Sequence, residues 1–191
     1  MAEKSLSQST YEAYLVLEAE SNTKYEYHNG FIVAMAGGTP AHSQIGANVN
    51  WAVTNALMEN AQPCRVYNSD LKVRIESINR TYYPDASVGC DEPTFSEKDP
   101  QALTNPTIIF EVLSKSNEGF DRGTKFHHYR QLTSLKEYVL LSQTEPTVDV
   151  YFRKDLNLWE TTTYQGMQDH VHLKSIDCTI PVQALYRMVS L

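Results

Sequence analysis

The sequence has few cysteines and no pattern that organises them. Only Cys64, Cys90 and Cys178 occur, without CxxC spacing or a cysteine–histidine metal motif. An odd number of widely separated cysteines is typical of reduced thiols in a cytosolic protein. We therefore expect three free cysteines and a cytoplasmic location.

Secretion and membrane signals are also missing. The N-terminal residues lack a basic segment followed by an apolar core, so no signal peptide is predicted. Residues 31–58 contain no charged side chain, but Gly37, Gly38 and Pro40 interrupt the segment and several polar residues follow. A transmembrane helix needs ~20 predominantly apolar residues. This segment does not qualify, and no membrane association is expected.

The sequence has fewer basic than acidic residues. The net charge is −7, from 16 basic and 23 acidic residues. Proteins that bind nucleic acid usually carry a basic surface, so any such surface here must be local. The residues Arg122, Lys125, Arg130 and Lys136, with His127 and His128, form one basic stretch. Most charge runs of this kind are simply solvated helix faces.

Common nucleotide and hydrolase motifs are absent as well. There is no GxxxxGK[ST] and no GxSxG, and Gly37-Gly38 lacks a dinucleotide-binding pattern. With 191 residues and 41% hydrophobic content, the chain suits one globular domain over residues 1–191. We place the core at about residues 9–152, and further strands and a helix at residues 153–191.

The pattern of apolar residues predicts an α/β fold. Asn29-Gly30 lies between two β-prone runs and predicts a tight hairpin. Hairpins followed by a strand–helix–strand crossover favour a mixed sheet flanked by helices. Helices are expected after Ser9, which should cap the first one together with Glu12, and at residues 41–58, 120–134 and 181–188. Strands are expected at residues 64–77 and 81–90, which should be joined near Asn79, and at residues 104–114, 135–142 and 147–154. One or two more strands should lie within residues 156–173.

Asp85 and Glu111 are the most informative pair of residues. Glu111 lies in the apolar run of residues 108–113, where a carboxylate is costly unless it is paired or binds a cation. Ile109, Glu111 and Leu113 should share one face of a strand. Asp85 follows Pro84 near a strand start. The two carboxylates could converge on a divalent cation such as Mg²⁺. From spacing alone, a buried salt bridge explains Glu111 equally well.

An ordered set of motifs identifies a family resemblance. Residues 24–30 (KYEYHNG), Tyr83-Pro84-Asp85, residues 105–114 around Glu111, and DRGTKF at 121–126 followed by Tyr129-Arg130 resemble the Uma family of putative restriction endonucleases. This family is part of the PD-(D/E)xK nuclease superfamily. The resemblance spans about Ser9 to Phe152. It implies a restriction-endonuclease-like fold and hydrolysis of phosphodiester bonds that depends on Mg²⁺ or Mn²⁺, with Asp85 and Glu111 as metal ligands.

One superfamily residue is missing, because the lysine of the motif would fall at position 113, which is leucine. That lysine normally stabilises charge that develops on the phosphate. We favour Lys125, on the following helix, as its replacement. Lys72 is a second candidate, because a hairpin in which Ile75 faces Tyr82 would put Lys72 opposite Asp85, although a one-residue slip would turn it away. In a third alternative no lysine serves, and the site is slow or inactive.

Four further residues are candidates near the site. His42, at a helix start, could bind a phosphate or orient a ligand, although a capping or core histidine is as good an explanation. Glu26 could be a third carboxylate or a surface strand residue. Arg122 could position phosphates. Asp70 is better explained as a turn residue.

Three hypotheses follow for the function. The first is a metal-dependent endonuclease acting on DNA, with Asp85, Glu111 and Lys125 at the centre and Glu26, His42, Lys72 and Arg122 in support. The second is a catalytically weak or inactive module of the same fold that binds nucleic acid or a protein. The third is a structural or partner-binding protein in which Glu111 forms a salt bridge. By analogy with restriction enzymes that cut two strands, a homodimer is conceivable, but no sequence feature indicates it.

Overall fold

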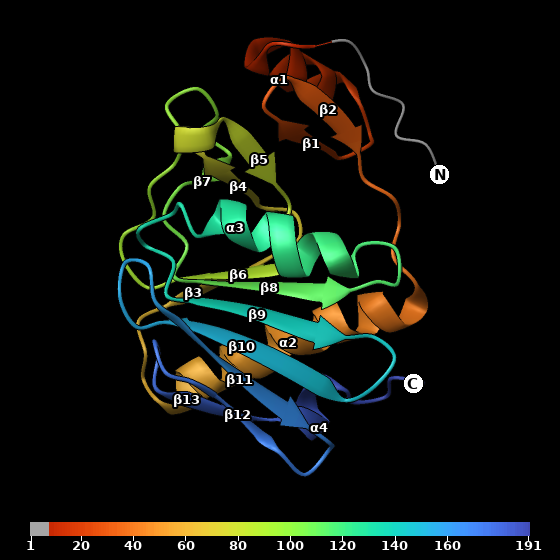
Figure 1. Cartoon of the computed structure of the whole chain (residues 1–191), viewed down its shortest axis with the longest axis vertical. Helices are drawn as coiled ribbons and strands as arrows, with labels where there is room; N and C mark the ends of the chain where they lie inside the picture. The colour runs from red at the N-terminus through yellow and green to blue at the C-terminus, as the bar shows by residue number, and fades with distance from the viewer. Residues whose placement is uncertain (1–7) are drawn as a thin grey trace.

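The computed structural model describes residues 8–191, which form three β-sheets with few helices. The larger, six-stranded sheet has the order β11-β10-β9-β8-β6-β3, and a five-stranded sheet has the order β2-β1-β5-β4-β7. Figure 1 shows the five-stranded sheet with α1 at one end of the molecule, the six-stranded sheet at the centre, and β12 and β13 at the other end. The predicted α/β class, with a mixed central sheet and an N-terminal hairpin, is confirmed.

The elements have the following bounds. The helices are α1 Tyr11–Glu20, α2 Pro40–Glu59, α3 Phe126–Tyr129 and α4 Val182–Leu185, with a 3₁₀ turn η1 at Glu76–Ile78 and a π-helix η2 at Phe120–Lys125 that runs into α3. The strands are β1 Tyr25–His28, β2 Phe31–Ala34, β3 Arg65–Asn68, β4 Lys72–Ile75, β5 Arg80–Tyr82, β6 Ala86–Gly89, β7 Ala102–Leu103, β8 Ile108–Leu113, β9 Glu137–Ser142, β10 Thr147–Arg153, β11 Trp159–Gln165, β12 His170–Leu173 and β13 Cys178–Pro181.

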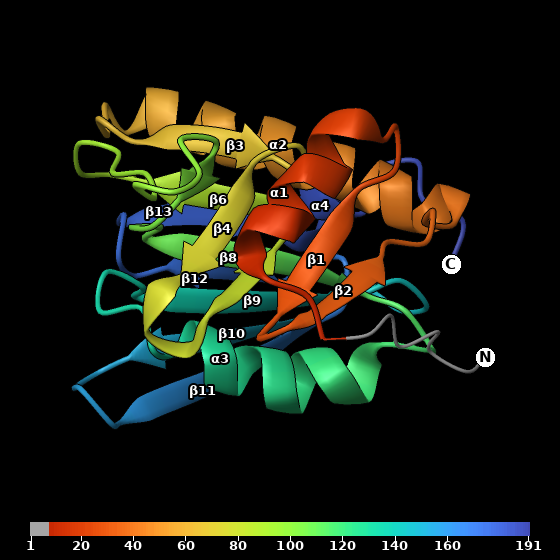
Figure 2. The ribbon, with the colours of Figure 1, turned by 90° about the horizontal axis from the view of Figure 1, so that it is seen from above.

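Two helical segments cover opposite faces of the six-stranded sheet. Viewed from above, α2 lies along one face and η2 with α3 along the other (Figure 2). Strand β8 is buried along its whole length, and its residues alternate between the faces. Ile108, Phe110 and Val112 pack in the core cluster with α2, whereas Ile109 and Leu113 pack in the cluster with α3. The strand therefore turns Glu111 toward α3.

Local signals account for the best-predicted elements. Asn29 and Gly30 both have positive φ, at 48° and 102°, as the β1–β2 hairpin turn requires. Strands β8 and β9 pair in parallel, and η2 with α3 forms the crossover between them. The predicted helix at 41–58 corresponds to α2. The closing helix is shorter than expected, since α4 ends at Leu185.

Three sequence expectations need correction. Thr10, rather than Ser9, caps α1, because its hydroxyl accepts the Ala13 N–H at 3.1 Å. Each of the two long strands predicted at 64–77 and 81–90 is divided in two. In the β4–β5 hairpin Ile75 faces Arg80 and not Tyr82, because η1 occupies the residues between the strands.

The cysteine expectation is also wrong. Cys64 and Cys90 form a disulfide, and only Cys178 is free. Arg65 pairs with Gly89 in the antiparallel β3–β6 ladder, so the next residues outward, Cys64 and Cys90, face each other with their Cα atoms 4.0 Å apart. Strand pairing, which sequence spacing does not reveal, brings the two thiols together.

Candidate active site

Glu111 is the centre of a buried polar cluster on the α3 side of β8. The residue is 4% exposed. Burial raises its pKa well above the usual range, and Asp121 and Asp85 add repulsion that Lys125 only partly offsets. A carboxylate in this position is stable only with partners that supply positive charge or hydrogen bonds.

Lys125 is the partner that supplies the charge. Its Nζ lies 2.8 Å from Glu111 Oε1, 3.8 Å from Asp121 Oδ1 and 3.9 Å from Glu26 Oε1. Burial alone would lower the pKa of Lys125, but these three carboxylates outweigh that effect and raise it. The ammonium is therefore a permanent cation. It comes from η2 and stands beside Glu111 although position 113 is leucine.

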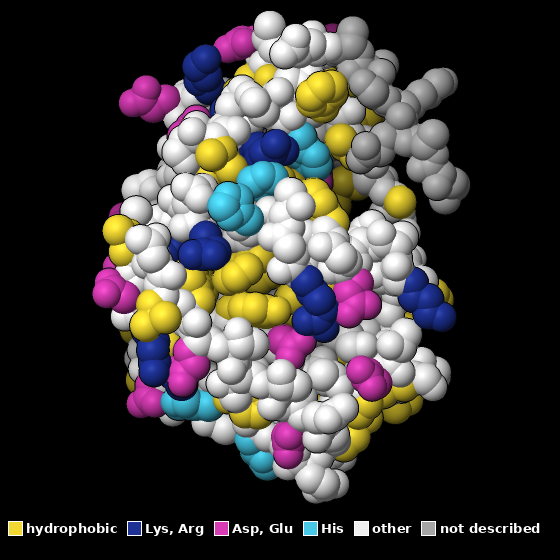
Figure 3. All heavy atoms as spheres, viewed as in Figure 1, with side chains coloured by type: hydrophobic (Ala, Val, Ile, Leu, Met, Phe, Trp, Pro, Cys, Tyr) yellow, Lys and Arg dark blue, Asp and Glu magenta, His cyan; other side chains and the backbone are white. Residues whose placement is uncertain are grey.

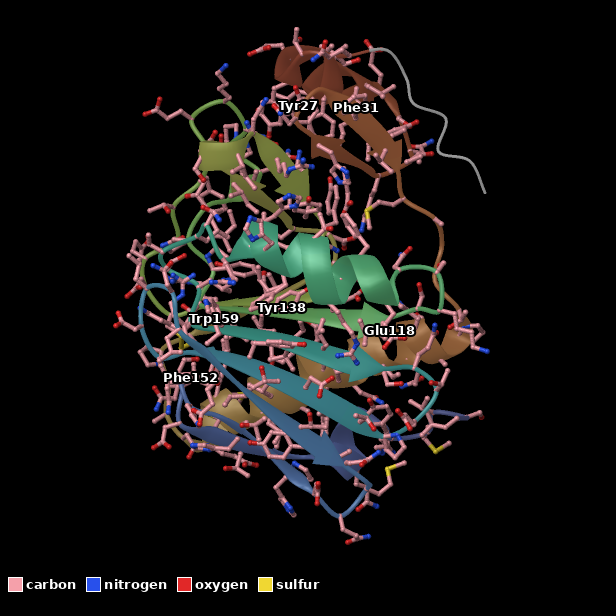
Figure 4. All side chains as sticks on the ribbon, viewed as in Figure 1. Tyr27, Phe31, Glu118, Tyr138, Phe152 and Trp159 are labelled. Carbon is pink, nitrogen blue, oxygen red and sulfur yellow. A yellow bond between two sulfur atoms is a disulfide. The ribbon has the colours of Figure 1, made fainter. Side chains whose placement is uncertain are left out.

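The π-helix η2 places Asp121 and Lys125 on the same side. π-helical turns are rare and are frequent at functional sites. The Tyr138 hydroxyl, which points up from the sheet toward this helix (Figure 4), donates to the backbone carbonyl of Asp121 at 3.0 Å. Burial raises the pKa of Asp121 to about 6, against the opposing effect of Lys125. Asp121 is a second carboxylate whose charge is only partly compensated.

Asp85 reaches the same cluster from the start of β6. Its Oδ2 accepts the Val112 N–H at 2.6 Å, next to Glu111 on β8. The same oxygen lies 3.3 Å from His42 Nε2, near the beginning of α2. The hydrogen bond to Asp85 raises the pKa of His42, although burial acts in the opposite direction. Residues from β6, β8, η2 and α2 thus meet at one point.

Glu26 closes the cluster from β1. Its Oε1 accepts the Tyr83 N–H at 3.3 Å, and its Oε2 lies 3.0 Å from His28 Nε2. Burial raises its pKa, but the charge of Lys125 and the hydrogen bond with His28 outweigh burial, so the pKa is lowered. Glu26 therefore lies inside the molecule, facing Lys125, and is not a surface strand residue.

The structure does not bring Lys72 or Arg122 to this cluster. Lys72 is buried between Glu18 and Asp99, at 2.9 and 2.8 Å, beneath α1. Arg122 instead forms ion pairs with Glu118 and Asp149, at 2.8 and 2.6 Å. Asp70 accepts hydrogen bonds in the turn between β3 and β4 and pairs with Lys24.

Sequence reasoning missed two members of the cluster. Asp121 appeared only as part of a family motif, although its position four residues before Lys125 was a usable signal on a helix. Tyr129 likewise appeared only as part of a family motif, yet its hydroxyl donates to Glu111 Oε1 at 3.2 Å. No sequence pattern distinguishes such a tyrosine from a core tyrosine.

Aromatic and histidine side chains border the cluster on one side. The Tyr82 ring lies 5.5 Å from Lys125 Nζ, and its hydroxyl lies 2.7 Å from His128 Nδ1. Burial, together with the charge of Arg80, lowers the pKa of His128 to about 4. On the face in Figure 3, histidine side chains gather where α3 meets the upper sheet. At neutral pH His128 is uncharged and adds no charge to the cluster.

A cleft of about 450 Å³ opens beside Asp85. It runs along the N-terminal half of α2. Besides Asp85 and His42, its lining is largely small or uncharged: Lys24, Met35, Ala36, Gly37, Gly38, Ser43, Gly46, Ala47, Asn50, Asn68 and Ser69. Glu111 and Lys125 do not line it. The cleft therefore meets the cluster only at Asp85 and His42.

The donor set fits a hard divalent cation. Glu111, Asp121 and Glu26 share a single lysine, Lys125, and Asp85 adds a fourth negative charge close enough to raise the pKa of Glu111. Oxygen ligands and uncompensated negative charge are what Mg²⁺ requires. Within residues 8–191, however, no three His, Cys, Asp or Glu residues are already arranged around one metal position. Asp85 and Glu111 could hold a cation whose coordination is completed by water or substrate oxygens.

The family follows from comparison with known sequences. Residues 11–183 match the sequence model of Uma2, described as "Putative restriction endonuclease". The chain belongs to the Uma2 family. An uncharacterised protein from Synechocystis sp. (strain PCC 6803) is 38% identical over 176 residues, covering 92% of this chain and 90% of that protein. A second from the same organism is 31% identical over 153 residues, covering 80% and 85%.

A solved structure supports the Uma2 fold. The crystal structure of a putative nuclease from Anabaena variabilis matches with a TM-score of 0.74, covering 97% of this chain and 99% of that one. At 18% identity the match shows the fold alone. In addition, no helix within residues 8–191 has both the length and the apolar character needed to cross a bilayer.

Proposed function

We propose that this Uma2 protein is a Mg²⁺- or Mn²⁺-dependent endonuclease that hydrolyses phosphodiester bonds of DNA. The observation that carries the proposal is the 2.8 Å approach of Lys125 to Glu111 beside Asp85. Two carboxylates and a lysine at one point are the components that the superfamily motif requires, with the lysine supplied by η2.

Each residue has a distinct role in the proposal. Asp85 and Glu111 would hold the cation, which would supply an activated water molecule and neutralise phosphate charge. Lys125 remains protonated and stabilises the charge that develops on the phosphate. Tyr129 and the Val112 N–H orient the two carboxylates through their hydrogen bonds. His42, whose pKa is raised by Asp85, is placed to bind a phosphate oxygen at the cleft.

Burial strengthens these interactions. Glu111, Asp121 and Lys125 are all less than 9% exposed, so water screens their charges weakly. Burial is the main cause of the raised pKa values of Glu111 and Asp121, and repulsion from neighbouring carboxylates adds to it, so Lys125 leaves part of the negative charge uncompensated. A divalent cation would offset that charge, and its binding should therefore stabilise the folded chain.

Cleavage of plasmid and oligonucleotide DNA with Mg²⁺ or Mn²⁺ tests the proposal. We expect cutting by the wild type, and none with EDTA or in Glu111→Gln. The matched control is Glu118→Gln, which changes an exposed carboxylate just before η2 (labelled in Figure 4) and should cut normally. Full cutting by Glu111→Gln, or no cutting by a folded wild type, would overturn the proposal.

One observation favours a second candidate, a non-catalytic module of the same fold. No preformed group of three metal-ligating residues occurs in the described part of the chain. A module of this kind would bind DNA or a protein without turnover. Thermal unfolding with and without the metal separates it from the third hypothesis, since a ligand that binds the folded state raises the melting temperature. Stabilisation without cleavage would identify the module.

A further inference from the structure

Three basic residues, Arg130, Lys136 and Arg153, form a basic cluster without an acidic partner. Arg130 follows α3, Lys136 precedes β9, and Arg153 ends β10. In the described part of the chain none of the three forms an ion pair, whereas the neighbouring Arg122 and Lys154 both do. Acidic residues outnumber basic ones in the whole chain, by 23 to 16, so this lack of partners is local.

Hydrogen bonds bring the three residues together. Arg153 Nη2 donates to the Arg130 carbonyl at 2.8 Å, and the Arg153 N–H donates to the Lys136 carbonyl, also at 2.8 Å. Lys136 therefore lies opposite Arg153, one pair beyond the β9–β10 ladder, and like charges in opposite positions destabilise a sheet. Burial lowers the pKa of Arg153, and repulsion from Arg130 lowers it further. A bound anion would relieve this repulsion.

The nearby carboxylates do not neutralise the basic cluster. In the two ladders of β10, Phe152 stands opposite a glutamate, Glu137 on β9 and Glu160 on β11. Since alternate residues of a strand point to opposite faces, both glutamates lie on the face away from Arg153. There Glu137 accepts backbone N–H groups and Glu160 pairs with two lysines. Asp155, in the β10–β11 turn, accepts a backbone N–H and has no ion pair among residues 8–191.

The ring of Trp159 holds the two guanidinium groups in place. The guanidinium of Arg153 lies 4.7 Å from the centre of this ring, and that of Arg130 lies 6.0 Å from it and 5.6 Å from the centre of the Phe126 ring. Figure 4 labels Trp159 where β11 begins, and on the face in Figure 3 hydrophobic side chains lie between basic ones. Side chains that are fixed in this way lose little conformational freedom when they bind a ligand.

Several N–H donors of the basic cluster have no acceptor. The Arg130 side chain makes no hydrogen bond with any residue that the structure describes, and Arg153 uses only its Nη2. Arg153 Nε and Trp159 Nε1 are buried without a partner, which is costly and adds positive potential. The planar fork of a guanidinium matches the oxygens of a phosphate. Free donors and uncompensated charge together indicate a phosphate group as the ligand.

We propose that the basic cluster binds phosphates of the DNA backbone, outside the candidate active site. The inference rests on the proposed nuclease function and adds a surface that holds the substrate. Arg130 follows Lys125 by five residues, which corresponds to about 8 Å along a helix axis. Each DNA strand carries a phosphate about every 3.4 Å of the duplex axis. One DNA molecule can therefore contact the basic cluster while another of its phosphates lies near Lys125.

The salt dependence of DNA binding tests the basic cluster. A fluorescein-labelled duplex is titrated with protein in EDTA, which prevents cleavage, and fluorescence anisotropy gives Kd at several salt concentrations. Each phosphate contact that is lost should reduce the slope of log K against log salt by about 0.9. Arg130→Gln should lower the slope by this amount, and Arg130→Gln/Lys136→Gln by about twice as much. Wild-type slopes in both variants, or no DNA binding by the wild type, would overturn the inference.

Arg187→Gln is the matched control for this experiment. Arg187 lies beyond α4 and, like Arg130, forms no ion pair with the described residues, so its replacement removes the same charge from a different place. The control should keep the wild-type slope. An equal reduction in Arg187→Gln and Arg130→Gln would reflect net charge alone and would reject the basic cluster as a site.

The fluorescence of Trp159 identifies the ligand. Trp51→Phe leaves Trp159 as the only tryptophan, and Trp51 is 58% exposed, so the fold should tolerate the change. Duplex DNA should alter the emission of this variant, and the effect should be lost when Arg130→Gln is added. An equal response to inorganic phosphate at the same concentration of phosphate groups would assign the cluster to a free anion. A response to phosphatidylglycerol vesicles but not to DNA would assign it to a lipid surface. Either result would overturn the inference.

Cleavage kinetics separate this inference from the nuclease proposal. Arg130→Gln should raise KM about tenfold and leave kcat unchanged, because a phosphate held away from the reacting bond contributes equally to substrate and transition-state binding. Cleavage with a wild-type KM in Arg130→Gln would reject the basic cluster and leave the nuclease standing. A folded wild type that never cuts, but shows the expected loss of salt dependence in Arg130→Gln, would reject the nuclease and support the basic cluster.

Discussion

The ammonium of Lys125, on η2, lies 2.8 Å from the carboxylate of Glu111, on β8. This contact predicts that Lys125 is the lysine the reaction needs. Lys125→Met should lower the rate of DNA cleavage about 10²- to 10³-fold, as the loss of one charge-stabilising donor does in other enzymes. The fold should survive, because the raised pKa of Glu111 lets it take up a proton when its partner is lost. Single-turnover cleavage assays and circular dichroism measure the two effects.

Lys115→Met is the matched control for this prediction. Lys115 follows β8 in an exposed loop, so its replacement should leave cleavage unchanged. A wild-type rate in Lys125→Met would show that no lysine of η2 takes part, and would favour the non-catalytic module or a different catalytic cation.

Lys72 should be important for stability and not for cleavage. It is 5% exposed and joins Glu18 of α1 to Asp99. Lys72→Met leaves two buried carboxylates without their cation, and the free energy of unfolding should fall by about 3–5 kcal/mol. Denaturant unfolding measures the loss, and cleavage at a temperature where the variant is folded should match the wild type.

The exposed pair of Lys98 and Glu12 provides the comparison for Lys72. Both side chains are 64% exposed, so Lys98→Met should change the free energy of unfolding by less than about 1 kcal/mol. Equal losses in the two variants would contradict the importance of burial. A cleavage defect in Lys72→Met but not in Lys98→Met would indicate that Lys72 takes part in cleavage.

The sequence predicted those parts of the fold that depend on short-range signals. Asn29-Gly30 requires a hairpin because both residues adopt positive φ, and the apolar run around Glu111 requires a buried strand. Register was predicted wrongly in the β4–β5 hairpin, because the 3₁₀ turn η1 changes which residues face each other. The disulfide was missed for a related reason, since it depends on which strand lies beside β3.

The candidate site was predicted to a similar extent. Asp85, Glu111 and Lys125 could be named as candidates because family motifs and a carboxylate in an apolar strand are visible in the sequence, and their catalytic roles stay a prediction. The groups that form hydrogen bonds with these carboxylates were not predicted. The Val112 N–H that binds Asp85 and the Tyr129 hydroxyl that binds Glu111 depend on the relative placement of strands and helix. That placement is a tertiary property.

The disulfide predicts a thiol count and a stability change. Under denaturing, non-reducing conditions one thiol per chain, that of Cys178, should react with Ellman's reagent, whereas three should react after reduction. The closed loop spans a sequence separation of 26, so its loss should lower the free energy of unfolding by about 3–4 kcal/mol. Denaturant unfolding of Cys64→Ser/Cys90→Ser measures that change. Three reactive thiols before reduction would show that the bond does not form in solution.

Asp121 should make the stability of the protein depend on pH. Its pKa is raised from 3.8 to about 6, chiefly by burial. Below about pH 4 the carboxyl is protonated in both the folded and the unfolded chain and has no net effect. Above about pH 6 it is ionised in both, and its buried charge lowers the free energy of unfolding by at most about 3 kcal/mol. Asp121→Asn should therefore stabilise the metal-free protein above pH 6.

The pH profile of the difference between Asp121→Asn and the wild type is the decisive measurement. Denaturant unfolding in EDTA should show a gain above pH 6 that declines steadily toward pH 4, since the folded wild type then binds the extra proton. A gain that is equal at both ends would mean that the amide stabilises by packing or hydrogen bonding, independently of charge. A loss above pH 6 would mean that the ion pair with Lys125, at 3.8 Å, outweighs the cost of burying the carboxylate.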